Sequence, residues 1–175
     1  MSFRTIARVA IISLSSWIAA SAQSGKERKS TTMRLFTRSG NLRRSRVRAQ
    51  AKITVQSSEA KPYHQTASPA LMEIRLSETF TGDIDGESPV RALQVLRDDQ
   101  SACLVSTQPF CGKPRGRQGT FVLQGSETVE HGKIKATWFV VPGSGTGDLS
   151  GLLGEGGFEG GFGKGSDGTL DYWFE

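Results

Sequence analysis

Three residues with polar groups lie on otherwise apolar faces of segments that alternate with a period of two, and they are the candidates for chemistry: Glu78, Trp138 and Tyr172. Each shares its parity with apolar neighbours, within residues 72–80, 134–140 and 170–174 respectively. Because alternate side chains of a strand point to the same face, all three are expected to point into the core. A carboxylate placed there would have a raised pKa and could act as an acid or base, or hold a ligand.

Simpler interpretations of the same three residues stay open. Glu78 could lie at a strand end that has already emerged into solvent beside Thr79 and Thr81, since Glu is seldom fully buried. Trp138 and Tyr172 could be core residues, each with one satisfied polar tip. The three residues are therefore candidate ligand contacts, and no catalytic residue is assigned.

A glycine-rich stretch, residues 140–157, contains the spacing Gly143-x-Gly145-x-Gly147 and invites comparison with a phosphate-binding loop. Such loops need a following helix N-terminus, or a Lys followed by Ser or Thr, to hold the phosphate. Here Asp148 and more glycine follow, with no helix-forming segment, and the carboxylate would repel a phosphate. We therefore predict a tight turn that leads into a strand bent by glycines, and no bound cofactor.

The other residues with metal-binding or nucleophilic side chains are isolated. His64 and His131 have no His or Cys at ligand spacing, so no metal site is predicted. Ser144 lacks the strand-turn-helix frame of a hydrolase nucleophile. Cys103 and Cys111 lie in one extended segment, on the order of 25 Å apart at ~3.3 Å per residue. A disulfide spans at most ~7 Å between Cα atoms, so we predict two free thiols.

Short strands are the elements that must position these residues. From Ala51 onward no segment sustains a helical period for three turns, whereas period-two runs recur between clusters of Gly, Pro and Asp. Strands are predicted at residues 51–55, 71–80, 88–96, 101–110, 120–124, 133–141 and 169–174. The polar residues 58–69 and 124–132 are predicted to be a connection and a turn.

The pattern predicts an all-β fold in a single domain. A chain of 175 residues has room for one core, and its 21 glycines suit a β domain with many turns. Seven or eight strands with short connections and no crossover helix favour an antiparallel sheet, and closing that sheet into a barrel removes its edges. We predict a single antiparallel β-barrel of about eight strands, just wide enough for packed side chains or one small ligand.

Four blocks of the sequence, in order, resemble a known family: residues 80–86 (FTGDIDG), 117–124 (RQGTFVLQ), 138–152 (WFVVPGSGTGDLSGL) and 170–172 (LDY). The family is an uncharacterised bacterial domain of unknown function, number 3224, whose members look like small barrels of the allene oxide cyclase and dirigent type. The resemblance covers most of residues 51–175 and implies a barrel without an established activity. The family often has a His just after the second block and another shortly before the final Tyr, where this chain has Gly125 and residues 166–168.

The first 50 residues differ in composition from the rest. They hold 11 Lys and Arg and one acidic residue, Glu27, whereas the remainder is mildly acidic. Two Arg, an uncharged segment and Ala20-Ser21-Ala22 are typical of a signal peptide over residues 1–22, cleaved between Ala22 and Gln23. Residues 23–50 are then predicted to form a basic, disordered arm and residues 51–175 the barrel domain. The protein is accordingly expected in the periplasm or secreted.

Two alternatives remain for this leader. Residues 1–50 are Arg-rich, Ser-rich and poor in acids, as an organelle transit peptide is, or Met33 is the true start and the protein is cytoplasmic. The basic arm is solvated, or else it contacts anionic lipid or a polyanion. Because the excess positive charge belongs to this leader, no nucleic-acid partner is predicted for the barrel. Stable membrane insertion after cleavage is not predicted either.

Three functions remain open for the barrel. It could bind a small, mostly apolar molecule without catalysis. It could be an isomerase or cyclase resembling allene oxide cyclases, which shapes a reactive intermediate in a dry pocket. It could also be a structural or interaction protein with a filled core. An empty apolar cavity with Glu78 at its wall favours the first two functions, and a solid core favours the third. The oligomeric state is not defined by the sequence.

Overall fold

The computed structural model describes residues 45–64, 68–162 and 164–175. The predicted signal peptide over residues 1–22, its cleavage site at Ala22 and Gln23, and the predicted basic arm up to residue 44 lie outside the described residues. The first strand begins at Val47, so residues 47–50, which were predicted to end the arm, belong to the barrel.

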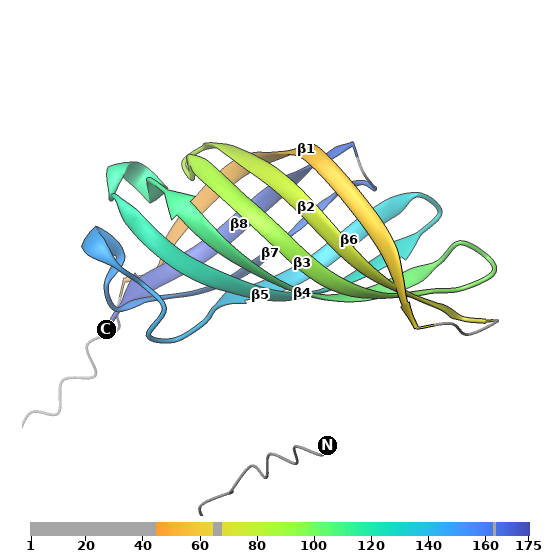
Figure 1. Cartoon of the computed structure of the whole chain (residues 1–175). Helices are drawn as coiled ribbons and strands as arrows, with labels where there is room; N and C mark the ends of the chain where they lie inside the picture. Colours follow the sequence, from red (N-terminus) through yellow and green to blue (C-terminus); the bar gives the residue numbers. More distant parts are fainter. Residues whose placement is uncertain (1–44, 65–67, 163) are drawn as a thin grey trace, which may run out of the picture. The chain divides into compact units, whose positions relative to one another are not determined.

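Eight strands form one closed antiparallel barrel in which each strand pairs with its neighbours in chain order, and the first pairs with the last (Figure 1). The predicted fold class is therefore confirmed. The strands are β1 (Val47–His64), β2 (Ala70–Gly82), β3 (Gly86–Leu96), β4 (Ala102–Gly112), β5 (Gly119–Glu130), β6 (Lys133–Val140), β7 (Leu152–Gly161) and β8 (Gly165–Phe174).

Alternation of side chains defines the inside of the barrel. In β3, the even-numbered residues from Ser88 to Gln94 are buried. The odd-numbered residues that alternate with them, such as Glu87 and Arg91, are exposed. The outer face carries ion pairs between neighbouring strands, such as Arg48 with Asp171 across β1 and β8, at 2.6 Å. Such exposed pairs contribute little stability, so burial of the inner face holds the barrel together.

β1 is much longer than predicted. The polar residues 58–69 were expected to form a connection, but β1 continues through them to His64 and pairs with β2 across irregularities after Val55 and after Pro62. The prediction was wrong because these residues are exposed, and backbone pairing with β2 needs no apolar pattern. Among the described residues, β1 pairs with β8 only as far as Ile53. Pro62 therefore lies on a part of β1 that pairs with β2 alone in the described chain, a position where the missing N–H of proline is tolerated.

β5 is also longer than predicted. Residues 124–132 were expected to form a turn, yet β5 extends to Glu130 and pairs with β6 as far as Lys133. Gly125 and Glu127 interrupt the alternation of apolar residues from which the strand was predicted, so its second half was not recognised. Both occupy positions in phase with Phe121 and Leu123, and Glu127 is buried. The turn itself is confined to His131 and Gly132, both with positive φ.

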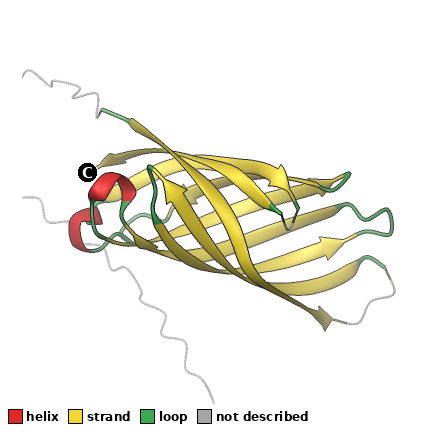
Figure 2. Cartoon of the chain, turned by 90° about the horizontal axis from the view of Figure 1, so that it is seen from above, coloured by secondary structure: helices red, strands yellow, loops and turns green. Residues whose placement is uncertain are grey.

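One half of the barrel is solidly packed, at the end where the two short 3-10 helices lie (Figure 2). A cluster of 14 buried residues fills it. Trp138, Phe80, Phe110 and Phe121 belong to it and contact one another in that order, with ring centroids 4.8 to 6.2 Å apart. Leu149, fully buried, closes this end. It belongs to η2 (Gly147–Leu149), a 3-10 helix that lies at the same end as η1 (Pro114–Gly116) and the C-terminus.

The glycine-rich stretch forms a turn and then a strand, as predicted. Gly143 and Gly147 have φ of +75° and +60°, a conformation that favours glycine, and η2 follows before β7 begins at Leu152. No ordinary α-helix follows this turn. Within the described ranges, no helix is long and apolar enough to cross a membrane.

Candidate functional site

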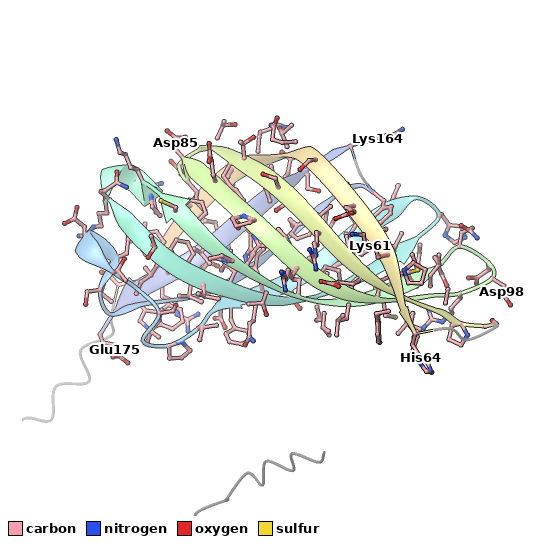
Figure 3. All side chains as sticks on the ribbon, in the orientation of Figure 1. Lys61, His64, Asp85, Asp98, Lys164 and Glu175 are labelled. Carbon is pink, nitrogen blue, oxygen red and sulfur yellow. The ribbon has the colours of Figure 1, made fainter. Side chains whose placement is uncertain are left out.

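The half of the barrel opposite η2 holds a second, smaller cluster of buried apolar residues, and these side chains leave an internal space. This space is a cavity of about 240 Å³, lined by residues of all eight strands. The walls are mainly apolar, with Ile74, Leu76, Val90, Ala92, Leu104, Ile134 and Phe158 among them. In Figure 3, His64 and Asp98 mark the end of the barrel that holds the cavity, and Asp85 and Glu175 mark the packed end.

The cavity opens where β1 separates from β8. Pairing between these strands stops at Ile53 and Ser166, while β1 continues along β2. Ser58 and Ala60 of this projecting part line the cavity and are exposed, as is Phe162 after β7. These exposed lining residues place the mouth of the cavity beside the projecting part of β1 and the end of β7.

Polar side chains form the inner end of the cavity. Glu78 lies between Leu76, which lines the cavity, and Phe80 of the packed cluster, two positions along β2 in either direction. Gln108 holds the same place on β4, between Ser106 and Phe110. The cavity thus has apolar walls and a polar floor, which we define by Glu78, Ser106, Gln108 and Glu127.

Glu78 faces inward, as its parity predicted, and is only 7% exposed. Burial, and to a smaller extent the nearby charge of Glu127, together raise the pKa of Glu78 to about 7. Both causes favour the neutral acid, because a carboxylate in apolar surroundings loses its hydration and is repelled by a second carboxylate. A carboxyl group with such a pKa can give or take a proton near neutral pH.

Glu127 of β5 is the second buried carboxyl group of the floor, also 7% exposed. Ser106 donates a hydrogen bond from its Oγ to Glu127 Oε1. Burial raises the pKa of Glu127, and this hydrogen bond opposes the rise. Gly125 leaves the space for this carboxylate, since a Cβ there would lie 3.0 Å from Oε1 of Glu127 and 3.2 Å from Oγ of Ser106.

Two buried atoms of the floor have no hydrogen-bond partner in the described part of the chain. They are Nε2 of Gln108, whose residue is 3% exposed, and Oε2 of Glu127. A buried polar atom without a partner costs on the order of 1–3 kcal/mol, so native proteins keep few of them. Both residues line the same cavity, and a bound molecule placed there could pair with them.

Trp138 and Tyr172 also face inward but do not line the cavity. Trp138 lies in the packed cluster and donates from Nε1 to the carbonyl oxygen of Thr169 at 3.0 Å. Tyr172, 4% exposed, belongs to the same cluster and meets the ring of Phe174 edge-on. Of the three residues predicted from alternation, the structure therefore brings only Glu78 to the cavity.

Sequence reasoning missed the partners of Glu78 on the floor. Glu127 is in phase with Phe121, Leu123 and Val129, which is the same pattern that identified Glu78. It was missed because β5 was predicted to end before it. Gln108 is in phase with Phe110 in the same way, so alternation along β4 identifies it as inward-facing once amides are considered with carboxylates.

The remaining candidates from the sequence lie away from the cavity. Cys103 and Cys111 are free and lie on the single strand β4, which confirms the predicted thiols. His64 ends β1, and His131 lies in the β5–β6 turn. Among the described residues, no group of three or more His, Cys, Asp or Glu is placed to hold a metal ion.

A larger groove of about 990 Å³ lies on the outer face of the barrel, beside Leu93, Val105 and Phe139. These three side chains are 46–58% exposed. The outer groove offers solvated surface, whereas the inner cavity combines burial, enclosure and unpaired polar atoms. The inner cavity is therefore the candidate site.

A closed barrel of eight strands with a polar-floored internal cavity is a small barrel of the size that can enclose one ligand. The family model described as "Protein of unknown function (DUF3224)" matches residues 49–175, and the chain belongs to this family. The resemblance seen in the sequence is thereby confirmed at the level of the family. No curated protein matches the chain.

The chain is also similar to a solved structure, that of a protein with unknown function from the DUF3224 family of Shewanella oneidensis MR-1. The two are 28% identical, and the match covers 75% of this chain and 98% of the other, with a TM-score of 0.65. The likeness to allene oxide cyclases that the family resemblance implies stays a prediction.

Proposed function

We propose that this protein binds a small, mostly apolar molecule inside its barrel. The observation that carries the proposal is the cavity of about 240 Å³, whose walls are apolar and whose floor holds buried polar atoms without partners. Pockets for small molecules have this composition, with a few polar groups that fix the orientation of a mainly apolar ligand.

The size of the cavity limits the ligand. An apolar cavity of about 150 Å³ accommodates benzene, and pockets for drug-sized molecules begin near ~300 Å³. A cavity of about 240 Å³ suits a molecule between these sizes. The opening beside Ser58, Ala60 and Phe162 allows entry without unfolding of the barrel.

A purely structural role explains the packed half of the barrel but not the half that holds the cavity. A filled core would place large apolar side chains at Ala92 and Ser106, which are inward-facing and small. Empty cavities and unpaired buried polar groups both lower stability. Their occurrence together in one place supports a binding function.

The proposal is tested by native mass spectrometry of protein purified from its own host. We expect a retained small molecule in the wild type and its loss in Ala92→Phe, which fills the cavity. Leu93→Phe is the matched control, because residue 93 is the neighbour of Ala92 on the outer face and is 47% exposed. Retention by Ala92→Phe, or no retained molecule in the wild type, would contradict the proposal.

A second candidate is an isomerase or cyclase that works in the same cavity. The observation that favours it is the pKa of Glu78, which burial and Glu127 raise to about 7, so that the group can transfer a proton near neutral pH. Turnover of an epoxide or another reactive lipid by the wild type, with loss in Glu78→Gln, would support it. Binding without turnover would contradict the enzymatic candidate and support only the non-catalytic binding function.

A further inference from the structure

The polar floor has an unusual charge balance for an enclosed site. Two carboxyl groups, Glu78 and Glu127, line the cavity, and the described residues around it include no Lys, Arg or His. A buried charge is strongly unfavourable unless an opposite charge or hydrogen bonds compensate it. When these two groups are ionised, no positive side chain of the described wall compensates their charge.

The hydrogen-bonding groups of the floor also indicate that it would accept a group rich in N–H donors. Glu127 Oε2 is an acceptor without a partner, and Glu78 presents a further carboxyl group. Gln108 has an unpaired Nε2, and a half-turn of its terminal amide would present the carbonyl oxygen instead, since the two assignments are nearly indistinguishable. The floor can therefore offer three acceptors to one group.

We propose that the molecule bound in the barrel is a small amphiphilic amine, whose ammonium group sits on the floor between Glu78, Glu127 and Gln108 and whose apolar part fills the walls toward the opening. An ammonium group has three N–H donors and a positive charge, so it matches three acceptors and two carboxylates at once. This inference rests on the proposed binding function and specifies the chemical class of the ligand.

The alternatives to an amine satisfy the floor less well. A hydroxyl group can donate to Glu127 and accept from Nε2 of Gln108, but it would leave the charge of the two carboxylates uncompensated once they are ionised. A carboxylate would be repelled by Glu78 and Glu127. The apolar walls, which include Ile74, Val90 and Leu104, match a hydrocarbon part and exclude a ligand that is polar throughout.

The proposal is tested by calorimetric titration with three compounds of similar shape: 2-phenylethylamine, 2-phenylethanol and phenylacetic acid. At pH 8 we expect the amine to bind the wild type at least tenfold more tightly than the alcohol, and the acid not to bind. Glu78→Gln and Glu127→Gln should each lower the affinity for the amine by tenfold or more. Glu87→Gln, an exposed carboxylate on β3, is the matched control and should bind as the wild type does.

The pH dependence of the wild type provides a readout that does not depend on any variant folding. Among the described residues that line the cavity, Glu78 and Glu127 are the groups that titrate. Because the amine prefers both as carboxylates, its affinity should rise several-fold from pH 6 to pH 8, while the affinity for the alcohol should show no such rise.

The outcomes separate this inference from the proposed function. If the alcohol binds as tightly as the amine, or if the affinity for the amine does not rise with pH, the amine class is wrong while binding in the barrel stands. If none of the three compounds binds, the amine inference also falls, and the retained molecule sought by native mass spectrometry still decides the proposed function.

Discussion

At the scale of single residues, Glu78 shows how an inward position on a strand changes the chemistry of a side chain. The same carboxyl group in solvent would be ionised at neutral pH. Inside the barrel its pKa is raised to about 7, because burial removes its hydration and Glu127 adds a like charge. The neutral acid is therefore a substantial part of the population near neutral pH.

The raised pKa of Glu78 has a consequence for stability. In the unfolded chain the group loses its proton near pH 4.5, but in the folded protein near 7. The folded state thus binds the proton more tightly, and the stabilisation present below pH 4.5 is lost as the pH rises through 7. We expect the wild type to lose up to about 3 kcal/mol more than Glu78→Gln between pH 5 and 8, measured by denaturant titration.

The exposed Glu87 provides the control for this prediction. Glu87→Gln should follow the pH profile of the wild type, since the Glu87 side chain is exposed in the folded protein as it is in the unfolded chain. If Glu78→Gln also ran parallel to the wild type, Glu78 would be solvated and would not serve as a buried acid.

At the scale of elements, β7 depends on glycine for its close approach to β8. A Cβ at Gly156 would collide with the carbonyl oxygen of Thr169 and lie 2.9 Å from Nε1 of Trp138. That nitrogen donates to the same carbonyl, so a side chain at this position would disturb both the β7–β8 pairing and a core hydrogen bond. The glycines of β7 therefore serve packing.

We expect Gly156→Ala to lower the free energy of unfolding by about 1–3 kcal/mol, the usual cost of an overpacked core. Gly161→Ala on the same strand is the control, because the nearest described atoms to its Cβ would be those of the flexible side chain of Lys164, at 3.4 Å or more. Denaturant titration of the two variants gives the comparison. Equal free energies of unfolding for the two variants would mean that β7 can move away from β8 at little cost, and would contradict the need for glycine at position 156.

β4 determines the state of the cysteines. One extended strand holds Cys103 and Cys111, and both are free. We expect a thiol reagent without reductant to label both after unfolding. In the native protein Cys111 should react first, because it is exposed whereas Cys103 is half-buried and its Sγ accepts a hydrogen bond from Arg97 at 3.3 Å. Peptide mass mapping over time distinguishes the two, and an intrachain bridge would contradict the prediction.

At the scale of the whole molecule, the two ends of the barrel differ in how completely side chains fill the interior. The end with η2 is filled by aromatic and aliphatic side chains. The opposite end has a smaller apolar cluster around the cavity, and the polar floor lies between the two ends. The packed half stabilises the closed sheet, and this allows the other half to keep a cavity. The polar floor lies at the boundary, where packed side chains on β2 and β4 adjoin Glu78 and Gln108.

The compartment of the protein is a separate prediction for the whole chain. Because Ala20-Ser21-Ala22 follows an uncharged segment of signal-peptide length, we propose that the protein is exported and that the mature chain begins at Gln23. The intact mass of protein recovered from the periplasm or medium checks this. A cytosolic chain that starts at Met1 or Met33 would contradict it.

The sequence by itself determined the class of fold, the inward direction of Glu78, Trp138 and Tyr172, and the free thiols. These features depend on local alternation and on distance along one strand, which a sequence displays directly. Its failures, the ends of β1 and β5, occurred where strands carry polar residues. There the pairing partner, and not the side-chain pattern, decides whether the backbone stays extended.

The cavity and its floor were decided only by the tertiary structure. Glu78 and Glu127 are 49 positions apart in the sequence and lie on strands that do not pair with each other. Closure of the sheet brings them together, and strand register decides which inward residues share a level of the barrel. A cavity is the space that inward side chains leave unfilled, so it depends on all eight strands at once and no single segment can reveal it.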